Sequence, residues 1–474
     1  MNVQAIRLCR FRGFREPTAI DLDRPLTVLL GANSSGKSSF GHAAAAMAHA
    51  QWLHAGSSQA TLTPRNARDA DDWPVDLGAF SDLRTAGTSG PVHVGLLTTE
   101  GWTDFGFGNL DSTADLRLSY IESPSGPVTS ASQLAVPDSF PSAPIALSDT
   151  GPGKIAAASG VRGTVLARIN EVQWKDEILV QLDGLIPLGA QERTGTSITL
   201  NRDSNIKIAK WLQDLTYIRA TRKRPMRGYE QGMGGTRQAL GYSGEFAASV
   251  LFRKGSEHVP FLSPPKIEMS KETALVMLDP EWASSPGVTL AEATSKWFSH
   301  LDLASEVQVI ESTRYPGRIE VRMTLRPGLQ SHDITEVGFG LSQVLPIVIA
   351  GLTQSPEGLL VVDLPEAHLH ARPQAALADF FCALVLAGGA VLIETHSDMF
   401  FHRLRLQASI NKHLMEKIRV YFLDPPGEHG LCSPPREIFL DSEGEVKWPP
   451  GFLQEAWEME IAITAARKAR GRKR

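Results

Sequence analysis

Apolar runs of strand length open the chain and lead into a helix. Residues 3–8 predict a strand, the apolar run 26–30 leads into a glycine loop, and Arg12-Gly13-Phe14 between them forms a turn signal. An alanine-rich stretch over about residues 39–53 follows, and its high helix propensity predicts a helix. We therefore expect the order strand, glycine-containing loop, helix near the N-terminus.

The pattern changes over about residues 61–201, where short runs alternate apolar and polar side chains. Residues 116–120 and 178–182 have this alternation, which predicts strands. Residues 123–153 are rich in Pro, Ser and Gly, so we expect a long surface loop there. This part of the chain is predicted to be β-rich.

Helical spacing returns over residues 206–215, with Trp211 and Leu212 on the apolar face. Residues 318–325 alternate again and predict a strand. In that strand Ile319, Val321, Met323 and Leu325 are expected to face inward, and Glu320 and Arg322 outward.

After residue 337 the pattern becomes α/β. Residues 359–362 and 391–393 are continuous apolar runs, as expected of parallel strands covered on both faces. The remaining elements expected here are helices over 373–387 and 400–410 and a strand over 419–423.

Composition limits the class of protein. A chain of 474 residues is longer than one compact core, so two or three subdomains are expected. The 42% hydrophobic and 21% charged residues are ordinary for a globular protein. Three cysteines without a CxxC pair argue against a disulfide scaffold or a cysteine-built zinc site. With no apolar run of membrane-spanning length and no signal-peptide core, we expect a cytoplasmic protein without a membrane partner.

The segment Gly31 to Ser38 matches the phosphate-loop pattern GxxxxGK[ST] in full and lies between the expected strand and helix. Glycines let backbone N–H groups turn toward a phosphate, and the helix N-terminus adds positive potential. Lys37 supplies charge at the β- and γ-phosphates, and the Ser38 hydroxyl ligates Mg²⁺. The residues expected to bind nucleotide here are Gly31, Asn33, Ser34, Ser35, Gly36, Lys37, Ser38 and Ser39.

A second expected strand ends in a carboxylate, which an enzyme with a phosphate loop needs near its Mg²⁺. Asp363 follows the apolar run 359–362 and is expected at the carboxyl end of that strand, where it would hold Mg²⁺ with Ser38. The alternative is an ordinary buried strand capped by an aspartate. The nearby pair His368 and His370 suggests either a metal site or a turn, and the absence of a cysteine or further ligand cluster favours the turn.

His396 follows another buried strand, residues 391–394, and a histidine in that position can reach a γ-phosphate. Ser397 is suited to cap the helix that begins near Phe400, and this capping is compatible with a functional His396.

Several segments together resemble the ABC-type ATPase heads of the SMC and RecF class, and most closely the OLD-like (overcoming lysogenization defect) ATPases of bacterial defence loci. The resemblance covers both ends of the chain, whereas residues 61–201 match only in general character. The segments that carry it are Ile6-Arg7-Leu8 with Phe11-Arg12-Gly13-Phe14, the phosphate loop, Tyr217-Ile218-Arg219 with Arg222, Pro225, Arg227 and Tyr229, residues 337–346, residues 365–370, Glu394-Thr395-His396-Ser397, and Trp448-Pro449-Pro450-Gly451-Phe452.

The resemblance implies an α/β fold: a P-loop ABC-type ATPase head with a β-rich lobe and a helical lobe inserted between the phosphate loop and the acidic strand. Its expected parts are residues 1–60, the first part of the ATPase core; 61–203, the β-rich insertion; 204–336, a helical and mixed lobe; and 337–474, the second part of the core. It also implies that two heads sandwich two ATP molecules, each phosphate loop facing the partner's segment 338–343. Within that segment Gly340, Ser342 and Gln343 are the expected nucleotide-binding residues, with Ser342 chosen as the donor although the segment departs from the LSGGQ form.

Three departures from the family pattern affect the expected chemistry. Leu364 stands where most such ATPases have the glutamate that polarises the attacking water, and leucine can neither accept a proton nor orient water. Glu366 either substitutes for it or hydrolysis is slow, so the expected catalytic set is Lys37, Asp363, Glu366 and His396. The glutamine that usually senses Mg²⁺ is not identified. The stretch after Ser397 is too short for the rest of a core plus the nuclease domain of OLD nucleases, so we expect that this chain cuts nothing itself.

Two basic clusters leave nucleic acid open as a partner. The end of the chain, residues 467–474, is expected either to hold phosphates or to form a solvated tail. The mid-chain cluster has three interpretations: DNA contact, contact with phosphate or acidic groups within an ATP dimer, or plain surface charge. Its members are Arg219, Arg222, Lys223, Arg224 and Arg227. The net charge of −5 confines any nucleic-acid contact to a local patch.

We therefore expect an ATPase that uses ATP and Mg²⁺, forms a homodimer or higher homo-oligomer, and switches an assembly. That assembly would act on DNA, as in DNA repair, or in antiviral defence through a separate effector such as a nuclease. The alternative is a scaffold or sensor that holds nucleotide with little turnover, as Leu364 would allow. A transporter ATPase subunit is disfavoured because the signature and the glutamine loop differ.

Overall fold

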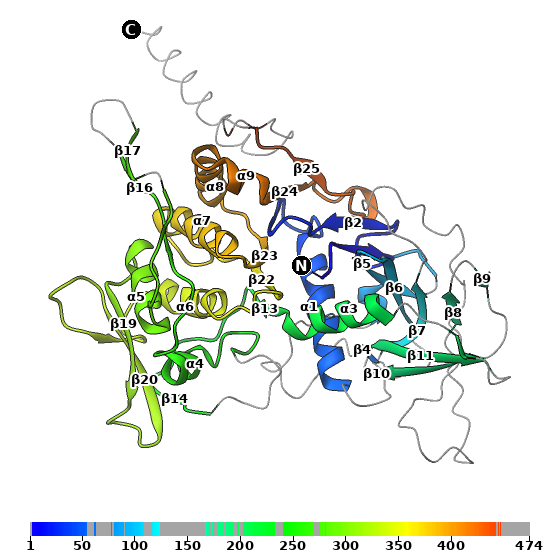
Figure 1. Ribbon diagram of the computed structural model, residues 1–474, viewed down its shortest axis with the longest axis horizontal. Helices are drawn as coiled ribbons and strands as arrows, with labels where there is room; N and C mark the ends of the chain where they lie inside the picture. The colour runs from blue at the N-terminus through cyan, green and yellow to red at the C-terminus, as the bar shows by residue number, and fades with distance from the viewer. Residues whose placement is uncertain are drawn as a thin grey trace, which may run out of the picture.

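The structure is a computed structural model in which the helices and strands form a central sheet flanked by two lobes (Figure 1). The expected α/β class is confirmed. The structure describes residues 2–54, 61–62, 77, 80–89, 91–108, 116–123, 166–169, 172–173, 178–183, 185–192, 197–198, 202–232, 240–269, 275–279, 281–441, 444 and 446. The expected loop over 123–153 lies outside these residues except for residue 123, which ends a strand, and the segment 448–452 and the basic end 467–474 also lie outside them.

The central sheet has six strands in the order β13-β22-β23-β3-β24-β25. Neighbours from β13 to β24 run parallel, and β25 is antiparallel to β24. Their bounds are Thr216–Ile218 for β13, Leu359–Asp363 for β22, Ala390–Glu394 for β23, Leu26–Gly31 for β3, Ile418–Leu423 for β24 and Arg436–Ile438 for β25. The strands expected at 26–30, 359–362, 391–393 and 419–423 are therefore confirmed.

Helices cover both faces of this sheet, which explains why its strands are apolar without alternation. Leu26, Val28 and Leu30 of β3 belong to one hydrophobic core with helices α6 to α8, whereas Leu29 belongs to another with α1 and α3. The helices are α1 Lys37–His54, α3 Arg202–Asp214, α6 Phe339–Leu352, α7 Ala371–Leu386 and α8 Asp398–Ile410, followed by the short α9 Lys412–Glu416.

The β-rich lobe is a largely antiparallel sheet of eight strands, at the right in Figure 1. Its path is β2-β1-β5-β6-β7-β8-β9, with β4 beside β7, and a separate sheet joins β10, β11 and β12. The bounds are β1 Ala5–Cys9, β2 Thr18–Asp21, β4 Thr61–Leu62, β5 Val92–Thr98, β6 Gly101–Gly108, β7 Leu116–Ser123, β8 Leu166–Ile169, β9 Val172–Gln173, β10 Ile178–Asp183, β11 Ile186–Glu192 and β12 Ser197–Ile198, with the short helix α2 Phe80–Leu83. β1 pairs with β5, so the first strand of the chain lies in this sheet rather than in the central one.

The second lobe, at the left in Figure 1, combines helices with small antiparallel sheets. Helices α4 Ala247–Lys254 and α5 Leu290–His300 pack with the sheet of β14 Tyr229–Glu230, β20 Arg318–Thr324, β19 Glu306–Glu311 and β21 His332–Asp333. Two further pairs are β15 Leu262–Ser263 with β18 Ala283–Ser284, and β16 Lys266–Met269 with β17 Leu275–Asp279. A capping box at Thr289 and Glu292 fixes the start of α5.

One side chain of β20 does not follow the expected alternation. Ile319, Val321 and Met323 are fully buried, as expected, but Glu320 is also buried and Leu325 is only partly so. The carboxylate of Glu320 accepts a hydrogen bond from the Ser312 hydroxyl, which offsets the cost of its burial. The expectation that Glu320 faces solvent is wrong for this reason.

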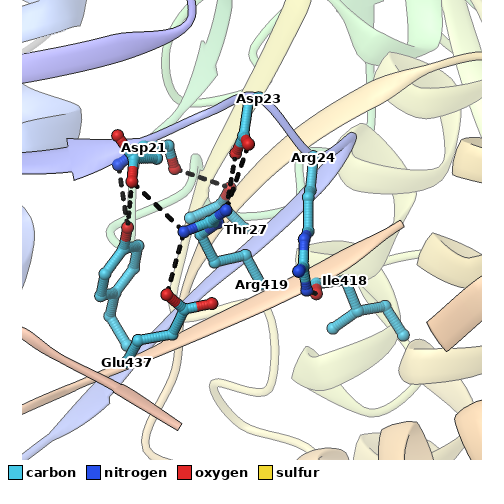
Figure 2. A network of polar contacts seen from close by, with 8 residues as sticks. Asp21, Asp23, Arg24, Thr27, Ile418, Arg419 and Glu437 are labelled. Atoms are coloured by element: carbon cyan, nitrogen blue, oxygen red, sulfur yellow. Dashed lines mark hydrogen bonds and ion pairs between the residues drawn. The ribbon is translucent and has the colours of Figure 1, made fainter. Parts of the chain in front are cut away.

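Arg419 joins the β-rich lobe to the central sheet (Figure 2). Its guanidinium lies 3.2 Å from Asp21 of β2, 3.1 Å from Asp23 and 3.0 Å from Glu437 of β25. The Asp21 backbone N–H donates to the Tyr421 hydroxyl at 2.9 Å. The two sheets are thus held by a charged network around β24, the strand beside the phosphate-loop strand.

A buried carboxylate joins α5, α7 and α8 on the other side of the central sheet. Asp379 is fully buried and accepts hydrogen bonds from His300 at 2.7 Å, from Arg403 at 2.7 and 2.8 Å, and from Gln407 at 2.7 Å. Burial alone would raise the pKa of Asp379, but the hydrogen bonds from His300 and Arg403 lower it below its ordinary value.

We expect Asp379→Asn to lower the free energy of unfolding by about 3 kcal/mol, because removing one member of a buried pair leaves Arg403 uncompensated. Chemical denaturation measures the difference. Asp302→Asn is the matched control, since Asp302 contacts Arg326 and Arg372 near the surface, and exposed pairs contribute about 0–1 kcal/mol. The folded pKa of Asp379 is depressed, so its contribution is lost as the pH falls below the ordinary aspartate pKa and through the folded one. A loss as small as that of Asp302→Asn would contradict the prediction.

Candidate functional site

The phosphate loop follows β3 and leads directly into α1, as the sequence indicates. Gly31 has φ +142°, and a Cβ there would lie 2.2 Å from the Leu423 carbonyl oxygen of β24. Gly36 has φ +92°, and a Cβ there would lie 2.7 Å from the Phe14 ring. Both positions therefore require glycine, and the Phe14 ring, from the turn after β1, lies next to the loop at Gly36.

Lys37 points back into this loop. Its Nζ donates to the carbonyl oxygens of Gly31 at 3.0 Å and Ala32 at 2.6 Å, and lies 3.4 Å from the Ser35 Oγ. Only 3% of Lys37 is exposed, and burial lowers the pKa of its ammonium while nearby Glu394 and Glu366 raise it. The positive charge is thus positioned inside the loop that is expected to hold phosphate.

Ser38 has a partner that the sequence analysis did not assign. Its hydroxyl donates to Glu394 Oε1 at 2.8 Å. Glu394 ends β23, which lies between β22 and β3, so its backbone is beside Asp363 on one side and Leu29 on the other. The available signal was the position of Glu394 at the end of a buried apolar run, the same feature that selected Asp363.

Asp363 lies at the carboxyl end of β22, where it was expected, and is 4% exposed. Its Oδ2 accepts a hydrogen bond from the Tyr217 hydroxyl at 2.5 Å and lies 3.3 Å from His42 Nε2 of α1. Burial and the Asp363 charge raise the pKa of Tyr217 well above its ordinary value, so the phenol remains a donor. Tyr217 and His42 were not identified from the sequence.

Two further carboxylates are buried beside this aspartate. Glu366 Oε1 accepts the His396 backbone N–H at 2.7 Å, and the second oxygens of Glu366 and Glu394 are both buried without a hydrogen-bond partner. Burial raises the pKa of Glu366. Burial, followed by the charge of Asp363, raises the pKa of Glu394 to about 7. This acidic cluster lies within reach of the Lys37 charge.

Arg222, from the mid-chain basic cluster, is buried rather than on the surface. It is 4% exposed and donates to the carbonyl oxygens of Asp363 at 2.7 Å and Leu364 at 2.9 Å. Burial lowers the pKa of its guanidinium to about 10, against the opposing charge of Glu366. Plain surface charge and direct DNA contact are therefore wrong for this residue, whereas Arg224 and Arg227 are exposed.

The contacts of Arg222 also explain the backbone after β22. Leu364 has φ +45°, a conformation that is costly for a branched side chain. Its N–H donates to the Glu394 carbonyl oxygen at 2.9 Å, and its own carbonyl oxygen accepts from Arg222. The position at which the resemblance implies a glutamate thus has a partly buried leucine on a tightly held turn.

His396 is exposed beside the phosphate loop and hydrogen-bonds to the Gly31 backbone. Burial of part of its ring and the Lys37 charge lower the pKa of His396, so its imidazole is mainly neutral at pH 7. Ser397 caps α8 as expected, accepting the Phe400 N–H at 3.1 Å. His368 and His370 lie in the turn before α7, where His370 is the N-cap, and no three His, Cys, Asp or Glu side chains among the described residues form a metal cluster.

The segment 338–343 forms the start of α6. Gly338 and Phe339 are exposed, whereas Gly340, Ser342 and Gln343 are buried. The Ser342 hydroxyl donates to the Phe339 carbonyl oxygen at 2.7 Å, and a Cβ on Gly340 would lie 2.5 Å from the His368 carbonyl oxygen. Phe339 packs edge-on against His368 at 4.8 Å between ring centroids, so the exposed end of α6 lies beside the turn after β22.

The residues at the carboxyl edge of the central sheet fit Mg²⁺ in the form that nucleotides bring. Mg²⁺ prefers oxygen ligands and is usually bound through one or two carboxylates together with substrate phosphates. Ser38, Asp363 and Glu394 supply such oxygens, and Glu394 Oε2 is buried without a partner.

Part of this chain matches a protein-family model. A family model described as "AAA domain, putative AbiEii toxin, Type IV TA system" matches residues 250–401, from α4 to α8. This range includes the start of α6, Asp363 and His396 but not the phosphate loop. No curated protein matches the chain.

Solved structures with some likeness include SMC heads. An SMC head domain from Thermotoga maritima has a TM-score of 0.34 and 11% identity, covering 92% of this chain and 99% of that chain. An Smc head from Pyrococcus furiosus, bound to the C-terminal domain of ScpA, has a TM-score of 0.41 and 10% identity, covering 98% and 99%. The fold itself is defined by the strand order and phosphate loop described above. No helix among the described residues is both long and apolar enough to cross a membrane.

Proposed function

We propose that this chain is an ATP-binding subunit that hydrolyses ATP slowly and uses it to switch an assembly. The observation that carries the proposal is the phosphate loop with Lys37 inside it, at the same sheet edge as Ser38, Asp363 and Glu394. A buried cation, a hydroxyl and carboxylates in this arrangement have the chemistry needed to bind a nucleoside triphosphate and its Mg²⁺. The matched AAA family supports the same function.

Each residue would contribute by position and charge. Lys37 would exchange its loop carbonyls for phosphate oxygens, and Ser38 would offer a lone pair to Mg²⁺ while keeping its hydrogen bond to a carboxylate. Asp363, held by Tyr217 and His42, would keep a negative charge next to the Mg²⁺. His396, exposed and mainly neutral, would contact the γ-phosphate beside Gly31.

The slow rate follows from Leu364. A glutamate at that position would normally orient the attacking water, and general-base assistance is worth about 10²–10⁴-fold. Glu366 is the substitute we propose, because one oxygen is held by the His396 N–H while the other is buried without a partner. If Glu366 does not act as the base, the protein becomes a nucleotide-holding scaffold, which is the second candidate function.

We further propose that ATP brings two copies together through the exposed start of α6. Phe339 is 39% exposed and Gly338 is also exposed, next to His368 and the turn that carries Glu366. An apolar ring at the mouth of a nucleotide site is suited to pack against a second subunit. Ser342, the donor chosen from the sequence, is a poor probe of this contact because its hydroxyl stabilises the first turn of α6.

Phe339→Arg is therefore expected to prevent ATP-dependent association and to leave ATP binding by one subunit intact. Sedimentation velocity with Mg²⁺, with and without ATP, measures the assembly. Phe439→Arg is the matched control, since Phe439 is 71% exposed and follows β25 rather than the α6 segment. Association of the Phe339→Arg protein at wild-type strength would refute this interface, and a wild type that never associates would refute ATP-driven dimerisation.

The assembly is proposed to act on DNA or in antiviral defence through a separate effector such as a nuclease. The description of the matched family, which names a toxin and a type IV TA system, supports a defence role. Co-purification of the wild type and of Lys37→Ala from the native host with ATP tests it. An effector retained equally by both proteins would contradict nucleotide control.

A further inference from the structure

We infer that Glu394 is a Mg²⁺-binding carboxylate of this site, acting with Ser38 and sharing the role that the sequence gives to Asp363. The inference rests on the proposed ATP binding and adds a residue to it. Three observations carry it: the hydrogen bond that Ser38 donates, the existing contacts of Asp363, and a carboxylate oxygen of Glu394 that lacks a partner.

The Ser38 hydroxyl has a single hydrogen, and its Oγ lies 2.8 Å from Glu394 Oε1, to which it donates a hydrogen bond. A serine that ligates Mg²⁺ does so through an oxygen lone pair, so its hydrogen still needs an acceptor. Glu394 provides that acceptor and thereby fixes the orientation of the serine lone pairs. This places Glu394 in direct contact with the expected metal ligand.

Asp363 is engaged elsewhere. Its Oδ2 accepts from the Tyr217 hydroxyl at 2.5 Å and lies 3.3 Å from His42 Nε2. Its carbonyl oxygen accepts a hydrogen bond from Arg222, so one carboxylate oxygen and the backbone of this residue are already engaged. The described structure shows no hydrogen bond between Asp363 and Ser38.

Glu394 has an oxygen available. Its Oε2 is buried without a hydrogen-bond partner, and the residue as a whole is only 8% exposed. Asp363 and Glu394 are paired in register on neighbouring parallel strands, which brings two buried carboxylates to one edge of the sheet. Two like charges in such a place repel, and either a proton on one of them or a nearby cation relieves the repulsion, while Lys37 is already bound to loop carbonyls. A divalent cation with its phosphate oxygens satisfies this arrangement.

The test is binding of Mn²⁺, a spectroscopic substitute for Mg²⁺, in the presence of ATP, followed by electron paramagnetic resonance on the full chain. Glu394→Gln keeps the size of the side chain and removes its charge. Mutation of a carboxylate that only orients a metal ligand typically lowers metal affinity by about 10–100-fold, so we expect a loss of at least that size for Glu394→Gln. ATP binding in EDTA, measured by calorimetry, should be unchanged, because Lys37 and the loop amides remain.

Glu366→Gln is the matched control, since Glu366 is equally buried in the same acidic cluster but engages the His396 N–H instead of Ser38. Its Mn²⁺ affinity should stay at the wild-type value. Wild-type affinity in Glu394→Gln would overturn the inference, and so would equal losses in both variants, since these would indicate only the net charge of the cluster.

A third variant keeps the inference testable if Glu394→Gln fails to fold. Glu394→Asp retains the charge but withdraws the carboxylate from Ser38, so Mn²⁺ affinity should fall, and an unchanged affinity would again overturn the assignment. Failure of the wild type to bind ATP, even in EDTA, is a different result: it would refute the proposed function, and the inference with it. ATP binding by a wild type that does not bind Mn²⁺ would refute the inference alone.

Discussion

Lys37→Ala is expected to abolish tight ATP binding. Hydrogen bonds from a charged donor contribute roughly 1.5–3 kcal/mol each, and Lys37 has the geometry to donate more than one, so affinity should fall by at least about 100-fold. The backbone N–H groups of the loop cannot replace this charge, because the ammonium is the buried cation inside the loop. Isothermal titration calorimetry with Mg²⁺ present measures the loss.

Lys210→Ala is a suitable control for this measurement. Lys210 lies on the exposed side of α3 and pairs with Glu357, so its removal should leave ATP affinity and stability close to wild type. Thermal unfolding without nucleotide checks that both variants are folded. Wild-type ATP affinity in Lys37→Ala would remove the basis of the proposed function.

The central part of the fold could be predicted because its signals are local. A buried strand, a glycine loop and an alanine-rich helix are contiguous in sequence, so the elements around Gly31 and Lys37 follow from residues that are neighbours along the chain. Asp363 was also identifiable, since an acidic residue directly after an apolar strand lies at the edge where parallel strands end. For these residues, local order and three-dimensional position coincide.

The contact between Ser38 and Glu394 could not be predicted in the same way, because it depends on strand order. β23 lies between β22 and β3, and nothing in the sequence alone fixes that arrangement. Once the order is known, Glu394 must lie beside Asp363 and close to the start of α1. The contact is therefore a consequence of topology rather than of a motif.

Arg222 is a second residue whose contacts could not be predicted from the sequence. Arginine is almost never fully buried without partners, so a cluster of basic residues in sequence is normally interpreted as surface. Here two backbone carbonyl oxygens at the end of β22 and the nearby Glu366 compensate the buried guanidinium. Only the packing of β13 against β22 brings these groups together.

The last prediction concerns turnover. Wild-type hydrolysis is expected to be slow because Leu364 occupies the usual place of the base, on a turn with φ +45°. If Glu366 substitutes, Glu366→Gln should lower the rate by about 10²–10⁴-fold and leave ATP binding intact. Phosphate release under single-turnover conditions, with binding measured in parallel, separates the two effects.

Leu364→Glu gives the complementary experiment. A glutamate there should raise the rate of hydrolysis. Arg222 and the Glu394 carbonyl oxygen already fix the backbone of residue 364. The resemblance implies a glutamate at this position, so the new carboxylate would lie where the general base is expected. Leu364→Gln is its control, since glutamine has the same length but cannot accept the proton. Fast wild-type hydrolysis that is insensitive to Glu366→Gln would contradict both the slow switch and the substitute base. The base would then have to be sought elsewhere in the chain or in a partner subunit, because Asp363 is held by Tyr217 and His42 and Glu394 is assigned to Mg²⁺.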